Sequence, residues 1–322
     1  MKIPVVFWNG GSYKLINFGV FAAFGAMFGY SVGFFYLYSK GLEISQYCWT
    51  ISFILVFFNI FFAKAYNIFS IGIKPYFGNF RHNFNDTSFY LQGGIIGFIL
   101  GTFLLYFLLN IPFAILADAV SIGGIIVMAF GRIGCHNYGC CTGKPTCGRI
   151  GIVYKDPNAK ICRENPQMMN VPLIPIQLIS SAINFLIFAV CVFIAFYYPY
   201  SGLITITFFI AVNIKRILIQ KYRLKEGKNK IPYRSVSFGF IIAIILIIWF
   251  FQSTGELFFQ PSVSVIPFTP GNYFRFIISD FNVVTSLLFV FVVNFIAYGI
   301  NGRVVGKHFN LPSDSQQPIH TI

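Results

Sequence analysis

The residues of this chain best suited to chemistry are gathered in one short segment, 131–144, which reads GRIGCHNYGCCTGK. It holds two basic residues, three cysteines and four glycines, directly after an apolar run of membrane length. A charged side chain beside the hydrocarbon core is costly, and where it occurs it commonly marks a binding or transport site. The position of Arg132 therefore predicts that the functional site lies in this segment.

The cysteines admit several kinds of chemistry. Five of the seven fall between residues 131 and 172: Cys135, Cys140, Cys141, Cys147 and Cys162. Their spacing, C-x4-CC-x5-C, differs from the two-residue spacings of common zinc and iron–sulfur sites. We interpret them as residues lining a site, and a loop disulfide, a metal site or a nucleophilic Cys140 are the alternatives. We expect no bound metal and no cofactor, and no direct chemical role for His136.

Other polar residues interrupt the apolar segments. Asp118 lies within one of them, either as a structural hydrogen-bonding residue or as part of the site. Lys215 and Arg216 end another segment, and Arg223 follows Arg216 by seven residues. Such basic side chains either extend to the headgroup layer or converge with Arg132 on a phosphate, which guanidinium groups bind well.

The composition indicates the fold class. Hydrophobic residues make up 57% of the chain, charged residues only 10%, and the mean hydropathy is +0.73, whereas a soluble chain carries about a quarter charged residues. We predict an all-α, polytopic integral membrane bundle of seven to eight transmembrane helices, with no nucleic-acid partner. The apolar segments are 15–38, 46–63, 89–109, 112–130, 173–197, 201–219, 235–251 and 283–300.

The segments suggest how the chain is organised. We expect a membrane domain over 1–251, a loop with one further transmembrane helix over 252–300, and a polar tail over 301–322. Two rows of glycines recur at every fourth residue, which predicts close helix packing. They are Gly25, Gly29 and Gly33, and Gly93, Gly97 and Gly101.

Several blocks of the chain resemble one enzyme family when they are read in order. LQGGIIG at 91–97, Asp118 placed fourteen residues before Arg132, the 131–143 segment, IPIQL at 174–178 and RILIQKYR at 216–223 carry the similarity. They resemble the prolipoprotein diacylglyceryl transferases, membrane enzymes that move diacylglycerol from phosphatidylglycerol to a lipobox cysteine. The 131–143 segment is similar to a variant branch with the pattern G-R-x-G-C-x-x-x-G-C-C-x-G.

The resemblance implies a transferase of the bacterial plasma membrane. Its substrates would be phosphatidylglycerol, or another anionic phospholipid, and a prolipoprotein or related acceptor. Arg132 and Arg216 would be catalytic, holding the phosphate of the leaving glycerol phosphate. The implied substrate-binding residues are Gln92, Gly93, Gly94, Asp118, Cys135, Cys140, Gly143 and Arg223.

The chain also departs from the family pattern. Gln92 stands where the best-known members have histidine, Cys135 and Cys140 replace asparagine and glutamate, and Gln220 replaces a second glutamate. The arginines are kept while several candidate proton-handling groups are not. A non-catalytic protein that binds or transports anionic lipid is therefore the alternative.

The basic residues are unevenly distributed between the two sides of the membrane. Eight spans would place nineteen Lys and Arg on the side of the 131–172 segment and two, Lys40 and Arg275, on the other. The positive-inside rule would put that segment in the cytoplasm, whereas the family resemblance puts it outside. Attraction of basic loops to anionic headgroups offers one reconciliation, and we expect the family orientation.

Overall fold

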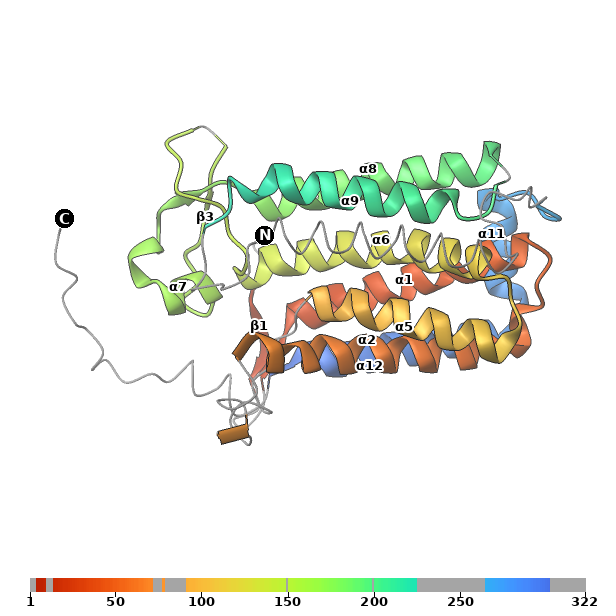
Figure 1. Ribbon diagram of the computed structural model, residues 1–322. Helices are drawn as coiled ribbons and strands as arrows, with labels where there is room; N and C mark the ends of the chain where they lie inside the picture. Colours follow the sequence, from red (N-terminus) through yellow and green to blue (C-terminus); the bar gives the residue numbers. More distant parts are fainter. Residues whose placement is uncertain are drawn as a thin grey trace.

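The fold is a bundle of long helices, seen in a computed structural model (Figure 1). It describes residues 4–9, 14–71, 77–78, 91–148, 150–198, 200–224 and 264–301. The main helices are α1 (Asn17–Ser39), α2 (Cys48–Ile71), α5 (Leu91–Leu109), α6 (Phe113–Tyr138), α8 (Ile176–Tyr197), α9 (Leu203–Gln220), α11 (Pro270–Ser279) and α12 (Phe281–Gly299). Three short helical elements join them: η1 (Ile44–Gln46), α7 (Lys160–Glu164) and η2 (Pro166–Met168).

The prediction of an all-α membrane bundle is confirmed. Six of the described helices are long and apolar enough to cross a membrane, and a shorter apolar helix covers Gly93–Leu109. The chain is therefore a multi-pass membrane protein. The predicted span at 235–251 lies outside the described residues.

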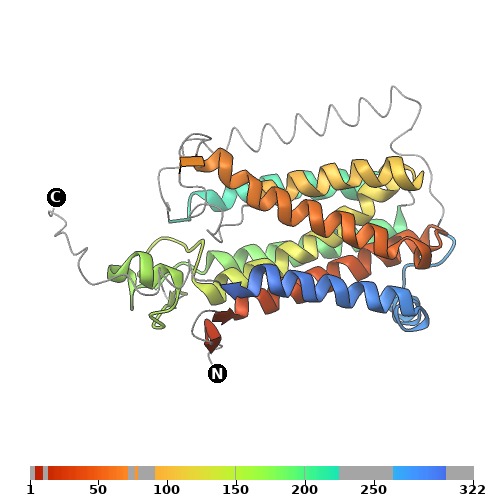
Figure 2. The same ribbon diagram turned by 90° about the horizontal axis from the view of Figure 1, so that it is seen from below.

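Helix α6 runs through the middle of the bundle. Helix α1 packs along one side of it, and α8 and α9 pack along another. Helix α5 packs mainly on α2, and α12 packs on α1 and α2, so these helices form a neighbouring layer (Figures 1 and 2). The predicted site residues of α6 therefore lie on a helix that packs against both α8 and α9.

Both glycine rows act in helix packing, as predicted. A Cβ added at Gly29 would lie 2.6 Å from the carbonyl oxygen of Gly123, which allows the backbones of α1 and α6 to approach closely. In α5, Gly93 and Gly97 face the backbone of α2, where an added Cβ would collide with the carbonyl oxygens of Phe62 and Phe58.

The predicted C-terminal helix is present as α12, and it belongs to the same bundle. A Cβ added at Gly19 of α1 would collide with the backbone of Gly299 at the end of α12. Close packing of the first and last described helices places them side by side. Apart from Asn301, the predicted tail at 301–322 lies outside the described residues.

Small strands gather at one end of the bundle, around the end of α6. Strands β1 (Val6–Asn9), β2 (Lys14–Ile16) and β5 (Ile300–Asn301) form an antiparallel sheet with β2 in the centre. Strands β3 (Ile152–Val153) and β4 (Pro172–Leu173) pair antiparallel near α7. Helix α11 lies at the opposite end (Figure 1). We call the end that holds β3 and α7 the loop end of the bundle.

The sequence-based boundary of the fourth apolar segment was wrong. We expected the helix to end near residue 130 and the 131–144 segment to be a loop, but α6 continues to Tyr138. Gly131 does not stop the helix because an interior glycine costs only about 1 kcal/mol. Arg132, Cys135 and His136 therefore project from a helix, at positions fixed by its geometry.

Candidate functional site

Gly139 determines how α6 ends and where the cysteines lie. Its backbone is left-handed, with a φ of 74°. Its N–H donates to two carbonyl oxygens, that of Cys135 at 3.0 Å and that of His136 at 3.3 Å. The N–H of Cys140 also donates to the Cys135 carbonyl, at 3.1 Å. This is the hydrogen-bond pattern of a Schellman motif, which turns the chain back over the last helical turn. Cys140 is thereby returned to Cys135.

The backbone after the cysteines is held between two other parts of the chain. Thr142 accepts a hydrogen bond from Leu224 N at 3.0 Å, and Lys144 N donates to Tyr222 O at 2.9 Å. Gly143 pairs with Arg223 in an isolated β-bridge, and an added Cβ there would lie 2.8 Å from the Cβ of Ile174. Gly143 therefore allows the segment to fit between the end of α9 and the start of α8, which fixes it beside Arg223.

Three thiols and two arginines meet at this point. The sulfur atoms of Cys135, Cys140 and Cys141 all lie within 4.8 Å of one another. Arg132 hydrogen-bonds to the side chain of Cys141, and Arg223 interacts electrostatically with the same residue. The structure thus brings together five of the residues that the sequence pointed to, from α6, the turn after it and the segment that follows α9.

Neighbouring groups shift the pKa values of Cys140 and Cys141 in opposite directions. Hydrogen bonds from Cys135 and Cys140, with the charges of Arg223 and Arg132, lower the pKa of Cys141 well below its ordinary value, although burial opposes them. Hydrogen bonds to Cys135 and Cys141, together with burial, raise the pKa of Cys140. A thiolate on Cys141 would thus be stabilised by its neighbours.

All seven cysteines belong to the described part of the chain, and none of them forms a disulfide there. The disulfide alternative for the loop is therefore not realised in this structure. Cys48 and Cys191 are buried in apolar helices, where they serve as small packing residues.

Further basic residues lie next to Arg132 inside the bundle. Lys215 of α9 is 94% buried and donates a hydrogen bond to Oδ1 of Asn184 on α8, which is completely buried. The charges of Arg132 and Arg216 both act on Lys215. Arg132 therefore interacts both with the thiol cluster and with Lys215, which adjoins Arg216 in the second half of α9, and these groups could together bind a polyanionic headgroup.

Gln177 and Tyr154, to which the sequence analysis gave no specific role, hydrogen-bond to the backbone next to the thiol cluster. The buried Gln177, at the start of α8, donates from Nε2 to the Cys140 carbonyl at 2.9 Å and to the Tyr154 hydroxyl at 3.3 Å. Tyr154 donates to the carbonyl of His136 at 3.1 Å, and burial raises its pKa. The IPIQL block at 174–178 was the signal that singled out this glutamine.

Asp118 lies far from this cluster, although we predicted it as a substrate-binding residue. Its carboxylate accepts hydrogen bonds from Gly202 N at 2.7 Å, Thr205 N at 2.8 Å and the Tyr36 hydroxyl at 3.2 Å. Fourteen residues of helix separate it from Arg132, about 21 Å along the axis. The structure thus favours the structural interpretation, in which Asp118 holds the N-terminus of α9.

The predicted residues on α5 occupy its first turns. Gln92 is the second residue of this helix, and its side chain lies outside the described part of the structure. Gly93 packs against α2, whereas a Cβ at Gly94 would lie 3.0 Å from the Asn59 amide nitrogen. The contacts of Gly93 therefore support helix packing as its role.

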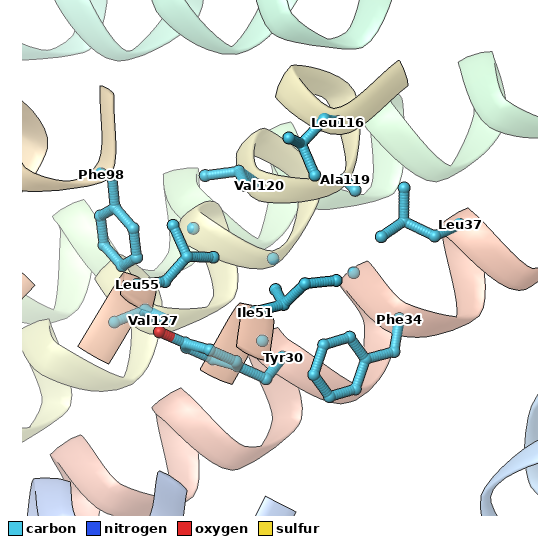
Figure 3. Close-up of a pocket in the computed structure, with 14 residues that line it drawn as sticks. Tyr30, Phe34, Leu37, Ile51, Leu55, Phe98, Leu116, Ala119, Val120 and Val127 are labelled. Carbon is cyan, nitrogen blue, oxygen red and sulfur yellow. The ribbon is translucent and has the colours of Figure 1, made fainter. Parts of the chain in front are cut away.

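An apolar pocket lies between α1, α2, α5 and α6 (Figure 3). Its cavity volume is about 30 Å³, the space within it reaches about 390 Å³ only when the open solvent is counted, and Tyr30 supplies the phenolic group among its lining residues. Phe98 of α5, Leu55 of α2 and Val127 of α6 line it. Val127 precedes Arg132 by five residues, about 7.5 Å along α6. An apolar lining at this position along α6 is suited to contact with hydrocarbon chains.

Comparison with known proteins shows the family of this chain. The family model for prolipoprotein diacylglyceryl transferase matches residues 4–254. The chain belongs to this family. The match includes the thiol cluster, all three arginines and the helices that carry them, while α12 lies beyond it.

Two similar relatives carry the name of the family's activity. A phosphatidylglycerol–prolipoprotein diacylglyceryl transferase 2 from Clostridium perfringens (strain 13 / Type A) is 35% identical over 99 residues, 31% of this chain and 36% of the relative. A phosphatidylglycerol–prolipoprotein diacylglyceryl transferase from Clostridium tetani (strain Massachusetts / E88) is 27% identical over 167 residues, 52% of this chain and 64% of the relative. Each alignment thus covers less than two thirds of the relative's length.

Proposed function

We propose that this chain transfers a diacylglyceryl group from phosphatidylglycerol to the cysteine thiol of a prolipoprotein at the bacterial plasma membrane. The observation that carries the proposal is the set of interactions of Arg132, which hydrogen-bonds to Cys141 beside Arg223 and acts electrostatically on Lys215. Family membership and the names of the two relatives support the same reaction.

The reaction is a nucleophilic substitution at a glycerol carbon, in which glycerol phosphate leaves. Its main requirement is stabilisation of the charge that develops on the departing phosphate, and positioned cations in a water-poor site supply it. Arg132 and Arg216 bind that phosphate, and Arg223 and Lys215 add positive charge around it. A guanidinium group binds phosphate through two parallel hydrogen bonds, which also fixes its orientation.

The acyl chains of the lipid extend away from the arginines, toward the middle of the membrane. The pocket between α1, α2, α5 and α6 begins near Val127, on the membrane side of Arg132. Removal of hydrocarbon surface from water stabilises this placement by about 25 cal/mol per Å² of buried apolar area. Headgroup and tails are then bound by different parts of α6.

The experiment uses the purified full chain in detergent, with phosphatidylglycerol radiolabelled in its acyl chains. The acceptor is a peptide with a lipobox cysteine, and the control is the same peptide with serine in place of that cysteine. We expect label on the cysteine peptide alone. Lipid that binds the protein without labelling the peptide would instead support a non-catalytic lipid-binding protein.

A further inference from the structure

The clustered thiols have a geometry that suits a metal ion. Zinc binds thiolate sulfur at about 2.3 Å, so two sulfurs on one tetrahedral ion lie about 3.8 Å apart. The sulfurs of Cys135, Cys140 and Cys141 lie within 4.8 Å of one another, so side-chain movements of about 1 Å bring them to that separation. The Schellman turn at Gly139 and the left-handed φ of 55° at Cys141 direct the three residues to the same place.

We propose that Cys135, Cys140 and Cys141 form a zinc site with an open fourth position, where the acceptor cysteine binds as a thiolate. This inference rests on the proposed function and replaces our sequence-based expectation of no metal. Structural zinc sites have four protein ligands, whereas catalytic sites have three and leave one position open. In the part of the chain that the structure describes, these three cysteines make up the whole group of candidate ligands.

The surroundings of the cluster suit a negatively charged metal centre. Three thiolates and Zn²⁺ carry a net charge of −1, and an acceptor thiolate would bring it to −2. The guanidinium groups of Arg132 and Arg223 adjoin Cys141 and would balance that charge. Gln177 fixes the turn behind the site through its 2.9 Å hydrogen bond to the Cys140 carbonyl, as outer residues do around metal ligands.

The zinc supplies a step that the reaction needs. An acceptor S–H must lose its proton to become a good nucleophile, and a thiol that coordinates zinc is deprotonated. The proton passes to water when the thiol binds. A sulfur electron pair then forms the S–C bond to the glycerol carbon as the C–O bond to phosphate breaks, and the bonding pair leaves with glycerol phosphate. The step needs no oxidant or reductant. The thioether product is neutral and a weak zinc ligand, so it dissociates.

The side chains around the cluster explain why a zinc ion, rather than a protein base, would deprotonate the acceptor thiol. The family resemblance leads us to expect asparagine and glutamate where Cys135 and Cys140 stand, so two oxygen- or nitrogen-bearing side chains are replaced by thiols. Asp118 is the carboxylate of α6, and it is about 21 Å along the helix from Arg132. The thiol cluster adjoins Arg132, so an acceptor thiolate bound there would lie close to the glycerol phosphate that leaves.

The first test measures metal directly, in the full chain purified without chelator. We expect about one zinc per chain by elemental mass spectrometry, and loss of most of it in Cys140→Ser and Cys141→Ser. Cys147→Ser is the matched control, because Cys147 is exposed and outside the cluster, and it should keep its zinc. Wild-type protein without stoichiometric zinc after incubation with a zinc salt, or with copper or iron in its place, would overturn the proposal.

The second test uses cobalt in place of zinc, and it needs no variant to fold and no turnover. The wild-type protein loaded with Co²⁺ should show thiolate-to-cobalt charge-transfer absorption, which should increase when the lipobox cysteine peptide is added. The serine peptide should leave the spectrum unchanged. An unchanged spectrum with both peptides would exclude thiol binding at the metal.

The two proposals fail in distinguishable ways. A metal-free protein that transfers lipid at the wild-type rate would remove the zinc site and leave the transferase function standing. A protein that binds zinc and shows the cobalt response to the peptide, yet transfers nothing from phosphatidylglycerol, would remove that function and keep the thiol-binding zinc site.

Discussion

Asp118 on α6 accepts two hydrogen bonds from Thr205 on α9, from its N–H at 2.8 Å and from its hydroxyl at 2.6 Å. With the bond from Gly202 N, the carboxylate satisfies backbone N–H groups at the start of α9, which helices otherwise leave without partners. This single side chain therefore fixes the end of α9 that lies opposite the arginines.

Asp118→Ala should destabilise the protein without weakening its lipid site. Loss of several buried hydrogen bonds to a charged group should cost about 3 kcal/mol of unfolding free energy. Thermal unfolding in detergent should show a clearly lower midpoint, with a smaller decrease for Thr205→Val. The KM for phosphatidylglycerol in the folded fraction should stay close to that of the wild type. A tenfold higher KM with unchanged thermal stability would instead place Asp118 in the substrate site.

Lys215 should contribute to lipid binding through its charge. Lys215→Met keeps an apolar side chain of similar length but removes the cation near Arg132 and Arg216. We expect kcat/KM for phosphatidylglycerol to fall about tenfold, which corresponds to about 1.4 kcal/mol. Lys221→Met is the matched control, since Lys221 is exposed just after α9, and it should change kcat/KM by less than about twofold. Equal effects of the two substitutions would contradict a specific role for Lys215.

Gly139 should be essential to the geometry of the cysteines. An alanine at φ 74° is strained by about 1–2 kcal/mol, and its Cβ would lie 3.0 Å from the Cβ of Ala159. Gly139→Ala should lower both the thermal midpoint and the zinc content. Gly131→Ala is the control, because none of the described atoms lies within 4 Å of an added Cβ there, and it should leave both quantities unchanged. Full zinc occupancy in Gly139→Ala would show that the turn does not position the thiols.

Membrane orientation can be tested at the two ends of the bundle. Lys155 and Arg275 are both exposed, near the loop end and in α11 at the opposite end, respectively. In a background without the native cysteines, we expect an impermeant thiol reagent to label Lys155→Cys in intact cells and to spare Arg275→Cys. The reverse pattern would mean that the positive-inside rule sets the orientation of this protein. Labelling at both positions would contradict a bundle that crosses the membrane.

Much of the fold could be predicted from the sequence because membrane helices are encoded by long apolar runs. The glycine rows in α1 and α5 also indicated close packing correctly, since a four-residue repeat lines one helix face. The end of α6 was placed eight residues too early, because Gly131 resembles a helix stop while Gly139 is the residue with left-handed backbone.

The candidate site was only partly predictable. Arg132, Arg216 and Arg223 stood out by their cost in an apolar chain, but the spacing of the cysteines gave no sign that their sulfurs would meet. That meeting depends on the Schellman turn, a three-dimensional feature that a search for two-residue metal spacings does not detect. Asp118 was assigned to the site on its spacing from Arg132, yet fourteen residues on a straight helix separate two groups by about 21 Å.

The most direct test of the account compares lipid transfer by wild-type protein, Arg132→Ala, Arg132→Lys and Arg275→Ala, with mass spectrometry of the cysteine peptide. Wild type and Arg275→Ala should convert the peptide to its diacylglyceryl thioether and release one glycerol phosphate per product. Arg132→Ala should lose more than about 100-fold in kcat, as for removal of a group that stabilises developing charge, and Arg132→Lys should recover only part of it. Thioether formation by folded Arg132→Ala at the wild-type rate would contradict the account.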